Sequence, residues 1–175
     1  MELFETLRKR HSTRQFGEGQ IPNESLEQIL LAGSMAPIGQ RLYNTLHLTV
    51  IQNKELLDEI SSITAISRGT PEANPLFDAP TLIVVSSNDD RGASIEYANA
   101  ACIIENMTLA ATALGLGSIY LWGVISATNK TPETLKKLNL PEGYKALSSL
   151  AVGYLGQETV ALKELEHKFT MDYIR

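Results

Sequence analysis

The stretch from residue 94 to residue 122, SIEYANAACIIENMTLAATALGLGSIYLW, organises the chain because it contains the most apolar segment of the sequence. Residues 94–114 are apolar at nearly every helical phase, which predicts a long helix buried in the middle of the fold. Asn99 and Glu105 interrupt the run, so it is not a membrane span. Gly115 predicts a left-handed C-cap. A strand is expected over 119–122.

The glycines at the end of this stretch invite a second interpretation, a dinucleotide-binding fingerprint. Such a fingerprint places its glycines after a strand and at the start of a helix. Gly115 and Gly117 follow the long helix and precede the expected strand. The sequence therefore favours the helix C-cap and rejects the fingerprint.

The segments on either side predict an α+β fold. Helices are expected over 2–11, from Asn23 as N-cap, over 54–66, and over 131–138 with Pro132 in the first turn. Strands are expected over 46–51, 81–86 and 147–154, and a loop over 69–80. Helices and strands do not alternate regularly, which fits α+β better than a βαβ series.

Composition narrows the class of protein. The 175 residues are 43% hydrophobic and 20% charged, with a net charge of −5, which is typical of one globular domain spanning 1–175. An acidic chain lacks the basic surface that non-specific nucleic-acid binding requires. The N-terminus lacks the basic-then-apolar order of a signal peptide, so we expect a cytoplasmic protein.

Side-chain catalysis and metal binding find little support in the sequence. Cys102 is the only cysteine, which excludes an internal disulfide and a zinc site built on thiolate pairs, and it is expected in the core. The histidines lack metal-ligand spacing, and His47 is expected on an exposed strand face. The serine pairs at 86–87 and 148–149 lack a glycine elbow. We therefore expect no metal and no catalytic side chain, with the chemistry supplied by a cofactor.

The sharpest local signal is the run Arg10-His11-Ser12-Thr13-Arg14 at the exit of the first helix. Guanidinium groups bind phosphate oxygens bidentately, and serine adds a neutral donor. A solvated basic helix end, complementing the helix dipole, is the other interpretation. Five residues alone do not choose between them.

Taken together, the motifs resemble those of the nitroreductase family over nearly the full chain. The first is the RxSxR-x-F pattern of residues 10–16, and the second ends in Ala36-Pro37. A core strand, the ALGLGS at the end of the long helix and a closing LPEG…VGY follow in the same order as in the family. These three lie at 78–85, at 113–118, and at 140–143 with 151–154.

The resemblance implies an intertwined homodimer with a mostly antiparallel sheet flanked by helices and with FMN at the subunit interface. Arg10, His11, Ser12 and Arg14 would bind its phosphate and its ribityl or pyrimidine end. Lys163 is the first candidate for a further phosphate ligand, and Lys168 is the reserve.

Two further groups follow from the resemblance. Pro37, Ile38, Gly39 and Arg41 of the partner subunit would pack beside the flavin, and a backbone N–H within Leu121, Trp122 and Gly123 would lie near flavin N5. Arg41 stands where the family usually has asparagine. It would face the flavin or an anionic acceptor, or else form an ion pair between subunits.

The implied function is an FMN-dependent oxidoreductase. Hydride would come from NAD(P)H, and a nitroaromatic, a quinone or a similar acceptor would be reduced by a ping-pong mechanism. The alternative is a flavin-binding or flavin-handling protein with little NAD(P)H turnover. A dimer that has lost FMN is disfavoured by the intact set of Arg10, Ser12 and Arg14.

Overall fold

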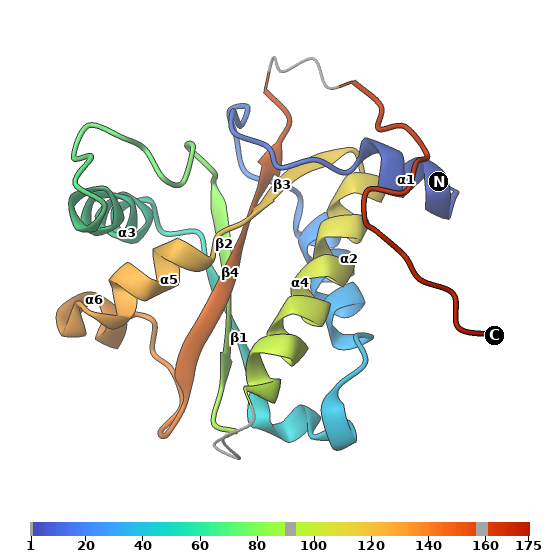
Figure 1. Ribbon diagram of the computed structural model, residues 1–175. Coiled ribbons are helices and arrows are strands. Elements are labelled where there is room, and N and C mark those ends of the chain that lie inside the picture. The colour runs from blue at the N-terminus through green and yellow to red at the C-terminus, as the bar shows by residue number, and fades with distance from the viewer. Residues whose placement is uncertain (1, 90–93, 157–160) are drawn as a thin grey trace.

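The computed structural model describes residues 2–89, 94–156 and 161–175 and is built on one four-stranded sheet of order β1-β2-β4-β3 (Figure 1). Every strand pairing in this sheet is antiparallel, in agreement with the expected mostly antiparallel sheet. The strands are β1 (Leu46–Ile51), β2 (Thr81–Ser87), β3 (Leu116–Tyr120) and β4 (Lys145–Tyr154).

Helices cover both faces of the sheet (Figure 1). The helices are α1 (Leu3–Lys9), α2 (Asn23–Ser34), α3 (Lys54–Ser67), α4 (Ile95–Ala113), α5 (Trp122–Asn129) and α6 (Pro132–Lys137), and single 3-10 turns lie at Gly39–Arg41 and Tyr43–Thr45. In β2, Ile83 and Val85 pack with α2 and α4, whereas Leu82 and Val84 pack on the face that α3 and α5 cover. Because side chains alternate along a strand, this strand is buried on both faces.

The long helix α4 is central, as the sequence predicts. Ile103, Ile104 and Met107 are buried in the core that α4 shares with α2 and the sheet, and Gly115 has a φ of 76° just beyond the C-terminal end. The opposite side of the helix, including Ala98 and Ala101, is exposed in the single chain. An apolar helix with one open side is typical of a surface that a partner covers.

The strand expected over 119–122 begins earlier and ends earlier. Strand β3 spans Leu116–Tyr120, and Trp122 opens α5, a helix that the sequence analysis missed. The Leu121 N–H donates to the Ser149 carbonyl at 2.8 Å, and the Ser149 hydroxyl donates to the Leu121 carbonyl at 2.7 Å. The Ser149 side chain therefore takes a carbonyl that would otherwise extend the strand, and the chain turns out of the sheet.

Smaller expectations are also corrected. Pro22, and not Asn23, is the N-cap of α2, and no side chain caps the helix. His47 is half-buried, because its ring contacts Tyr144 edge-on with centroids 6.0 Å apart. Cys102 is likewise only half-buried.

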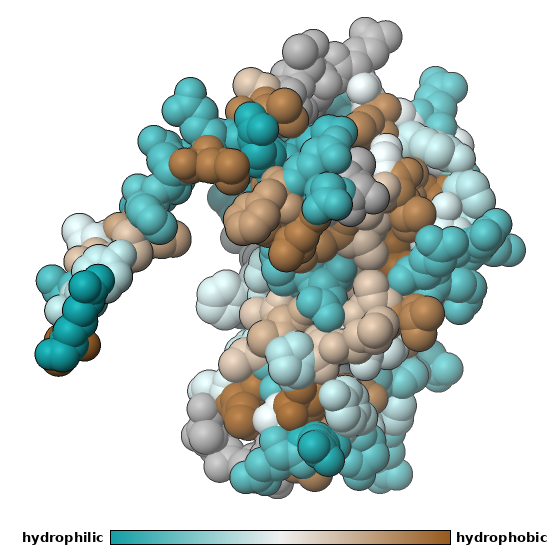
Figure 2. Space-filling model, turned by 90° about the vertical axis from the view of Figure 1, so that its right-hand side faces the viewer, coloured by the Kyte–Doolittle hydropathy of each residue, from teal (hydrophilic) through white to brown (hydrophobic). Residues whose placement is uncertain are grey.

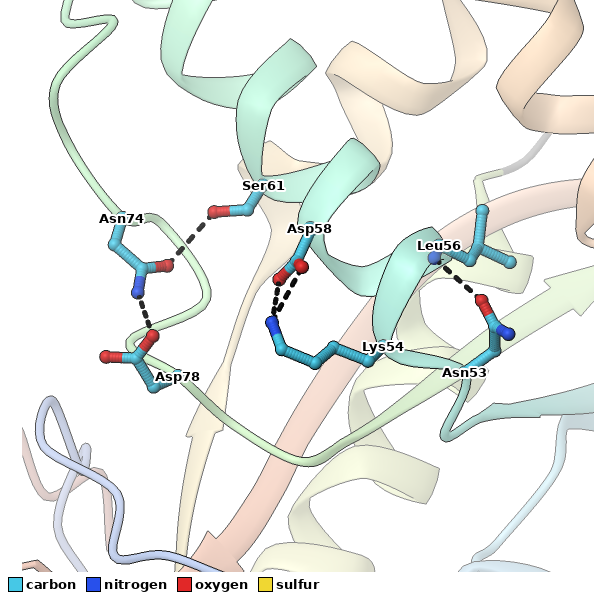
Figure 3. A network of polar contacts seen from close by, with 7 residues as sticks. All are labelled: Asn53, Lys54, Leu56, Asp58, Ser61, Asn74 and Asp78. Atoms are coloured by element: carbon cyan, nitrogen blue, oxygen red, sulfur yellow. Dashed lines mark hydrogen bonds and ion pairs between the residues drawn. The ribbon is translucent and has the colours of Figure 1, made fainter.

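Polar contacts fix the start of α3 and the loop over 69–80 that follows it (Figure 3). Asn53 caps the helix by accepting from the Leu56 N–H at 2.8 Å. The Ser61 hydroxyl donates to Asn74 at 3.0 Å, and the Asn74 amide donates to Asp78 at 2.7 Å. These bonds tie the loop back onto the helix.

Candidate functional site

The basic motif of the sequence lies along the edge strand β3. The Thr13 N–H donates to the Ser118 carbonyl at 3.0 Å, and Phe16 forms a bridge with Leu155. Thr13 is fully buried, whereas Ser12 is half-buried and Arg14 is exposed. Because side chains alternate in extended chain, burial of Thr13 presents Ser12 and Arg14 on the outer side.

His11 braces this segment. Its Nδ1 lies 3.1 Å from the Lys9 carbonyl oxygen, and its Nε2 lies 3.2 Å from the Thr13 hydroxyl. Both ring nitrogens are therefore within hydrogen-bond distance of groups of the protein. This geometry gives His11 a positioning role in the motif.

Lys163 lies beside the motif although it is far away in sequence. Its backbone N–H donates to the Arg8 carbonyl at 3.1 Å, and its ammonium donates to the Leu7 carbonyl at 3.3 Å. Burial, and then the charge of Arg10, lowers the pKa of Lys163, and Glu105 opposes this shift. Two cations held close together fit a dianionic phosphate. Lys168, the reserve candidate, is 62% exposed and pairs with Glu166 at 3.0 Å.

The corner at 121–123 lies at the other end of β3. Trp122 is four positions after Ser118, about 13 Å along the chain at roughly 3.3 Å per residue of extended chain. No side chain caps the first turn of α5. Backbone N–H groups at a helix start have no intrahelical acceptor, so this turn offers donors to a ligand.

The turn at 37–41 lies at the opposite end of α4 from the basic motif (Figure 1). The Gly39 N–H donates to Asn99 Oδ1 at 3.0 Å, and a Cβ at Gly39 would lie 2.5 Å from Ile95 Cδ1. Gln40 and Arg41 both have left-handed backbones, with φ of 57° and 58°. The backbone of the turn is therefore strained, and the hydrogen bond from Gly39 to Asn99 holds the turn against α4.

Within one chain, the structure brings Lys163 to the residues just before the motif, Leu7 and Arg8, and leaves the turn at 37–41 apart from them (Figure 1). Pro37, Ile38, Gly39 and Arg41 belong to that turn. Sequence reasoning missed Asn99, Tyr97 and Arg68, which contact the turn or the corner. The spacing of Asn99 along the helix gives no sign of its role, and Arg68 is an isolated cation before a loop.

Two observations concern membranes and metals. Within the described ranges, no helix is both long enough and apolar enough to cross a bilayer. Among the same residues, His, Cys, Asp and Glu side chains form no group of three or more that could hold a metal ion.

Comparison with known proteins gives the family. A family model described as the nitroreductase family matches residues 7–154. A protein of Archaeoglobus fulgidus, provisionally named NADH dehydrogenase/NAD(P)H nitroreductase, is 27% identical over 177 aligned positions that cover 99% of this chain and 96% of that protein.

Solved structures of nitroreductases resemble this chain over its full length. A Bacteroides fragilis nitroreductase, crystallised with bound FMN, is 31% identical with a TM-score of 0.85, and both chains are fully covered. A Desulfitobacterium hafniense nitroreductase with bound FMN shares the fold, with a TM-score of 0.84 at 23% identity over the whole of both chains.

The fold therefore defines the class: an antiparallel sheet between two helical layers, with a cation-lined segment along one edge strand. The family model covers most of the chain, and the Bacteroides fragilis protein matches it from end to end. The chain belongs to the nitroreductase family.

Proposed function

We propose that this protein is an FMN-dependent oxidoreductase that takes hydride from NAD(P)H and reduces a nitroaromatic, a quinone or a similar acceptor by a ping-pong mechanism. The observation that carries the proposal is the docking of Lys163 onto the end of α1, where it donates hydrogen bonds to the Arg8 and Leu7 carbonyls just before the motif on β3. From there, the strand leads over about 13 Å to the uncapped first turn of α5.

The residues present fit FMN at this place. Arg10, Ser12, Arg14 and Lys163 would bind the phosphate, because the guanidinium and ammonium groups are charged donors and the serine hydroxyl adds a neutral one. The backbone donors of Trp122 and Gly123 would orient the ring. FMN, when bound, supplies a two-electron carrier, so no side chain of this protein needs to act as acid, base or nucleophile.

The overall reaction balances without a further reagent. For a nitro acceptor it is R–NO₂ + NAD(P)H + H⁺ → R–NO + NAD(P)⁺ + H₂O. NAD(P)H gives up two electrons with its hydride, and the nitro group takes two electrons and two protons. NAD(P)⁺ leaves before the acceptor enters, so NAD(P)H and the acceptor bind one after the other at the same site.

We further propose that the active form is an intertwined homodimer. The exposed side of α4 carries Ala98 and Ala101, and Leu3 and Phe4 of α1 are exposed. The C-terminal tail projects from this face (Figure 2). Its exposed apolar residues are Leu165, Phe169, Met171, Tyr173 and Ile174. A second copy of the chain would cover these surfaces and would bring its own 37–41 turn to the flavin.

A visible absorption spectrum of the freshly purified protein tests the cofactor. We expect FMN, identified by mass after release, and its bleaching when NADH or NADPH is added anaerobically. A colourless protein that ignores added FMN would overturn the proposal. Stoichiometric FMN that neither nucleotide bleaches would instead identify a flavin-binding or flavin-handling protein with little turnover.

Substitution of the motif tests the phosphate site. Arg10→Ala or Ser12→Ala should weaken FMN binding, about ten- to a hundredfold for the arginine, because a hydrogen bond to a charged group is lost. The variants should keep the melting temperature of the apo-protein. The exposed Lys130, at the far end of α5, is the control. An Arg10→Ala protein that keeps full flavin occupancy would remove Arg10 from the site.

A further inference from the structure

Arg68 contacts the 121–123 corner, where the flavin ring is predicted, from the end of α3, far earlier in the chain. It is the C-cap residue of α3, and its Nη2 occupies the space where a side chain of Gly123 would stand. Glycine leaves room for this approach, because a Cβ at position 123 would displace the guanidinium from the position it occupies. The contact therefore depends on a residue of the corner itself.

Tyr97 reaches the same corner from the opposite face of the sheet. Its ring lies 6.4 Å from that of Trp122, centroid to centroid, at an interplanar angle of 60°. Both rings are open to solvent, Tyr97 at 45% and Trp122 at 64% exposure. Exposed aromatic rings beside each other offer a planar apolar surface to an aromatic ligand.

The charge of Arg68 is not neutralised within the described part of the chain, where it makes no ion pair with a carboxylate. Its guanidinium lies against the first turn of α5, where the helix dipole is also positive. Two positive contributions at one exposed corner favour an anion in front of them. If Arg68 only offset the negative end of the α3 helix dipole, its guanidinium would not need to contact Gly123.

We propose that Arg68, with the ring pair Tyr97 and Trp122, selects an aromatic electron acceptor that carries a carboxylate. This inference rests on the proposed function, because it assigns the acceptor end of the same site. The rings would pack against the acceptor, and the guanidinium would bind the carboxylate bidentately. The electrons come from NAD(P)H, and the nitro group of such an acceptor is reduced in the balanced reaction given above.

The test compares two acceptors that differ in charge and share a ring and a nitro group, 4-nitrobenzoate and 4-nitrobenzamide. With the FMN-loaded full-length protein, kcat/KM should be higher for the anion. Arg68→Ala should lower the ratio of the two kcat/KM values about tenfold, since one charge-assisted contact is lost. Arg68→Lys should keep part of the preference, and Lys130→Ala should keep all of it.

A binding measurement gives a readout that is independent of turnover. Trp122 is the only tryptophan in the chain, so its fluorescence reports directly on the corner. In the absence of NAD(P)H, 4-nitrobenzoate should quench this emission at lower concentration than 4-nitrobenzamide does. Arg68→Ala should remove the difference, and high salt should reduce it.

Each other outcome overturns the inference. An unchanged ratio in Arg68→Ala, with unchanged quenching, means that Arg68 does not face the acceptor. A variant that loses FMN while the ratio is unchanged places Arg68 at the flavin instead. Failure of the proposed function would be visible earlier, as wild-type protein without FMN or with FMN that NAD(P)H does not bleach, and the acceptor assignment would fall with it.

Discussion

At the residue scale, a buried asparagine links the turn at 37–41 to the central helix. Asn99 is only 4% exposed, and its Oδ1 accepts the Gly39 N–H at 3.0 Å, while its Nδ2 has no partner within the described residues. A buried donor without a partner costs free energy, and it is tolerated where the geometry serves another purpose. Here the bond holds a turn whose next two residues are left-handed.

Asn99→Ala should therefore loosen the turn at 37–41. We expect a loss of about 1 kcal/mol of stability, the usual net value of a hydrogen bond, together with weaker FMN binding. The matched control is Asn129→Ala, because Asn129 also donates its amide to a carbonyl, that of Ala146 at 2.9 Å, far from the turn. Urea unfolding and FMN titration of both variants check this. Equal loss of FMN affinity in the two would contradict a specific role of Asn99.

At the element scale, helix α6 is held to α3 by one carboxylate. Glu59 accepts a hydrogen bond from the Thr134 hydroxyl at 2.7 Å and pairs with Lys137. The hydrogen bonds from Lys137 and then from Thr134 lower the pKa of Glu59 below its ordinary value of 4.5. A carboxylate with a lowered pKa stabilises the fold above its unfolded pKa, and this contribution is lost as pH falls through the folded pKa.

Glu59→Gln should accordingly lower the melting temperature at neutral pH and have little effect in acid. The wild-type and variant curves of melting temperature against pH should converge below pH 4.5, where the wild-type carboxylate takes up its proton. The exposed pair of Lys54 and Asp58 gives a control, since Asp58→Asn removes an ion pair within one helix only. A gap that persists unchanged at low pH would mean that the charge of Glu59 does not hold α6.

At the scale of the whole molecule, one chain alone does not bring the two parts of the proposed site together. The cations of the motif lie at one end of α4 and the 37–41 turn at the other, and the apolar tail extends away from the body (Figures 1 and 2). Exposed apolar side chains such as Phe169, at 85%, are typical of a segment that packs on a partner. In the proposed twofold dimer, the turn of one chain would lie at the motif of the other.

Truncation after Glu166 tests this arrangement, because it removes the apolar end of the tail and keeps Lys163. We expect the full chain to elute as a dimer and the truncated chain to dissociate at higher concentration, with FMN affinity falling in parallel as dimer is lost. Multi-angle light scattering at several concentrations gives the measurement. A truncated protein that is as dimeric as the full chain would assign the tail no part in the interface.

Most helices and strands are predictable from the sequence alone, and so is the basic run at 10–14 that forms one part of the candidate site. A long apolar run predicts α4, and a short β-branched apolar run predicts the buried strand β2. The run at 10–14 is local, so its chemistry is readable without a fold. Its neighbour Lys163 was found only through the family resemblance. The end of β3 could not be read locally, because it depends on the Ser149 hydroxyl, which lies on another strand.

Which distant residues lie at the 121–123 corner follows only from the folded chain. Tyr97, Trp122 and Arg68 come from α4, α5 and α3, and no spacing along the chain relates them. Packing of two helical layers on one sheet converts such separations into contacts of a few ångströms. A local pattern therefore predicts the proposed phosphate site, whereas the proposed acceptor corner consists of side chains that only the folded sheet brings together.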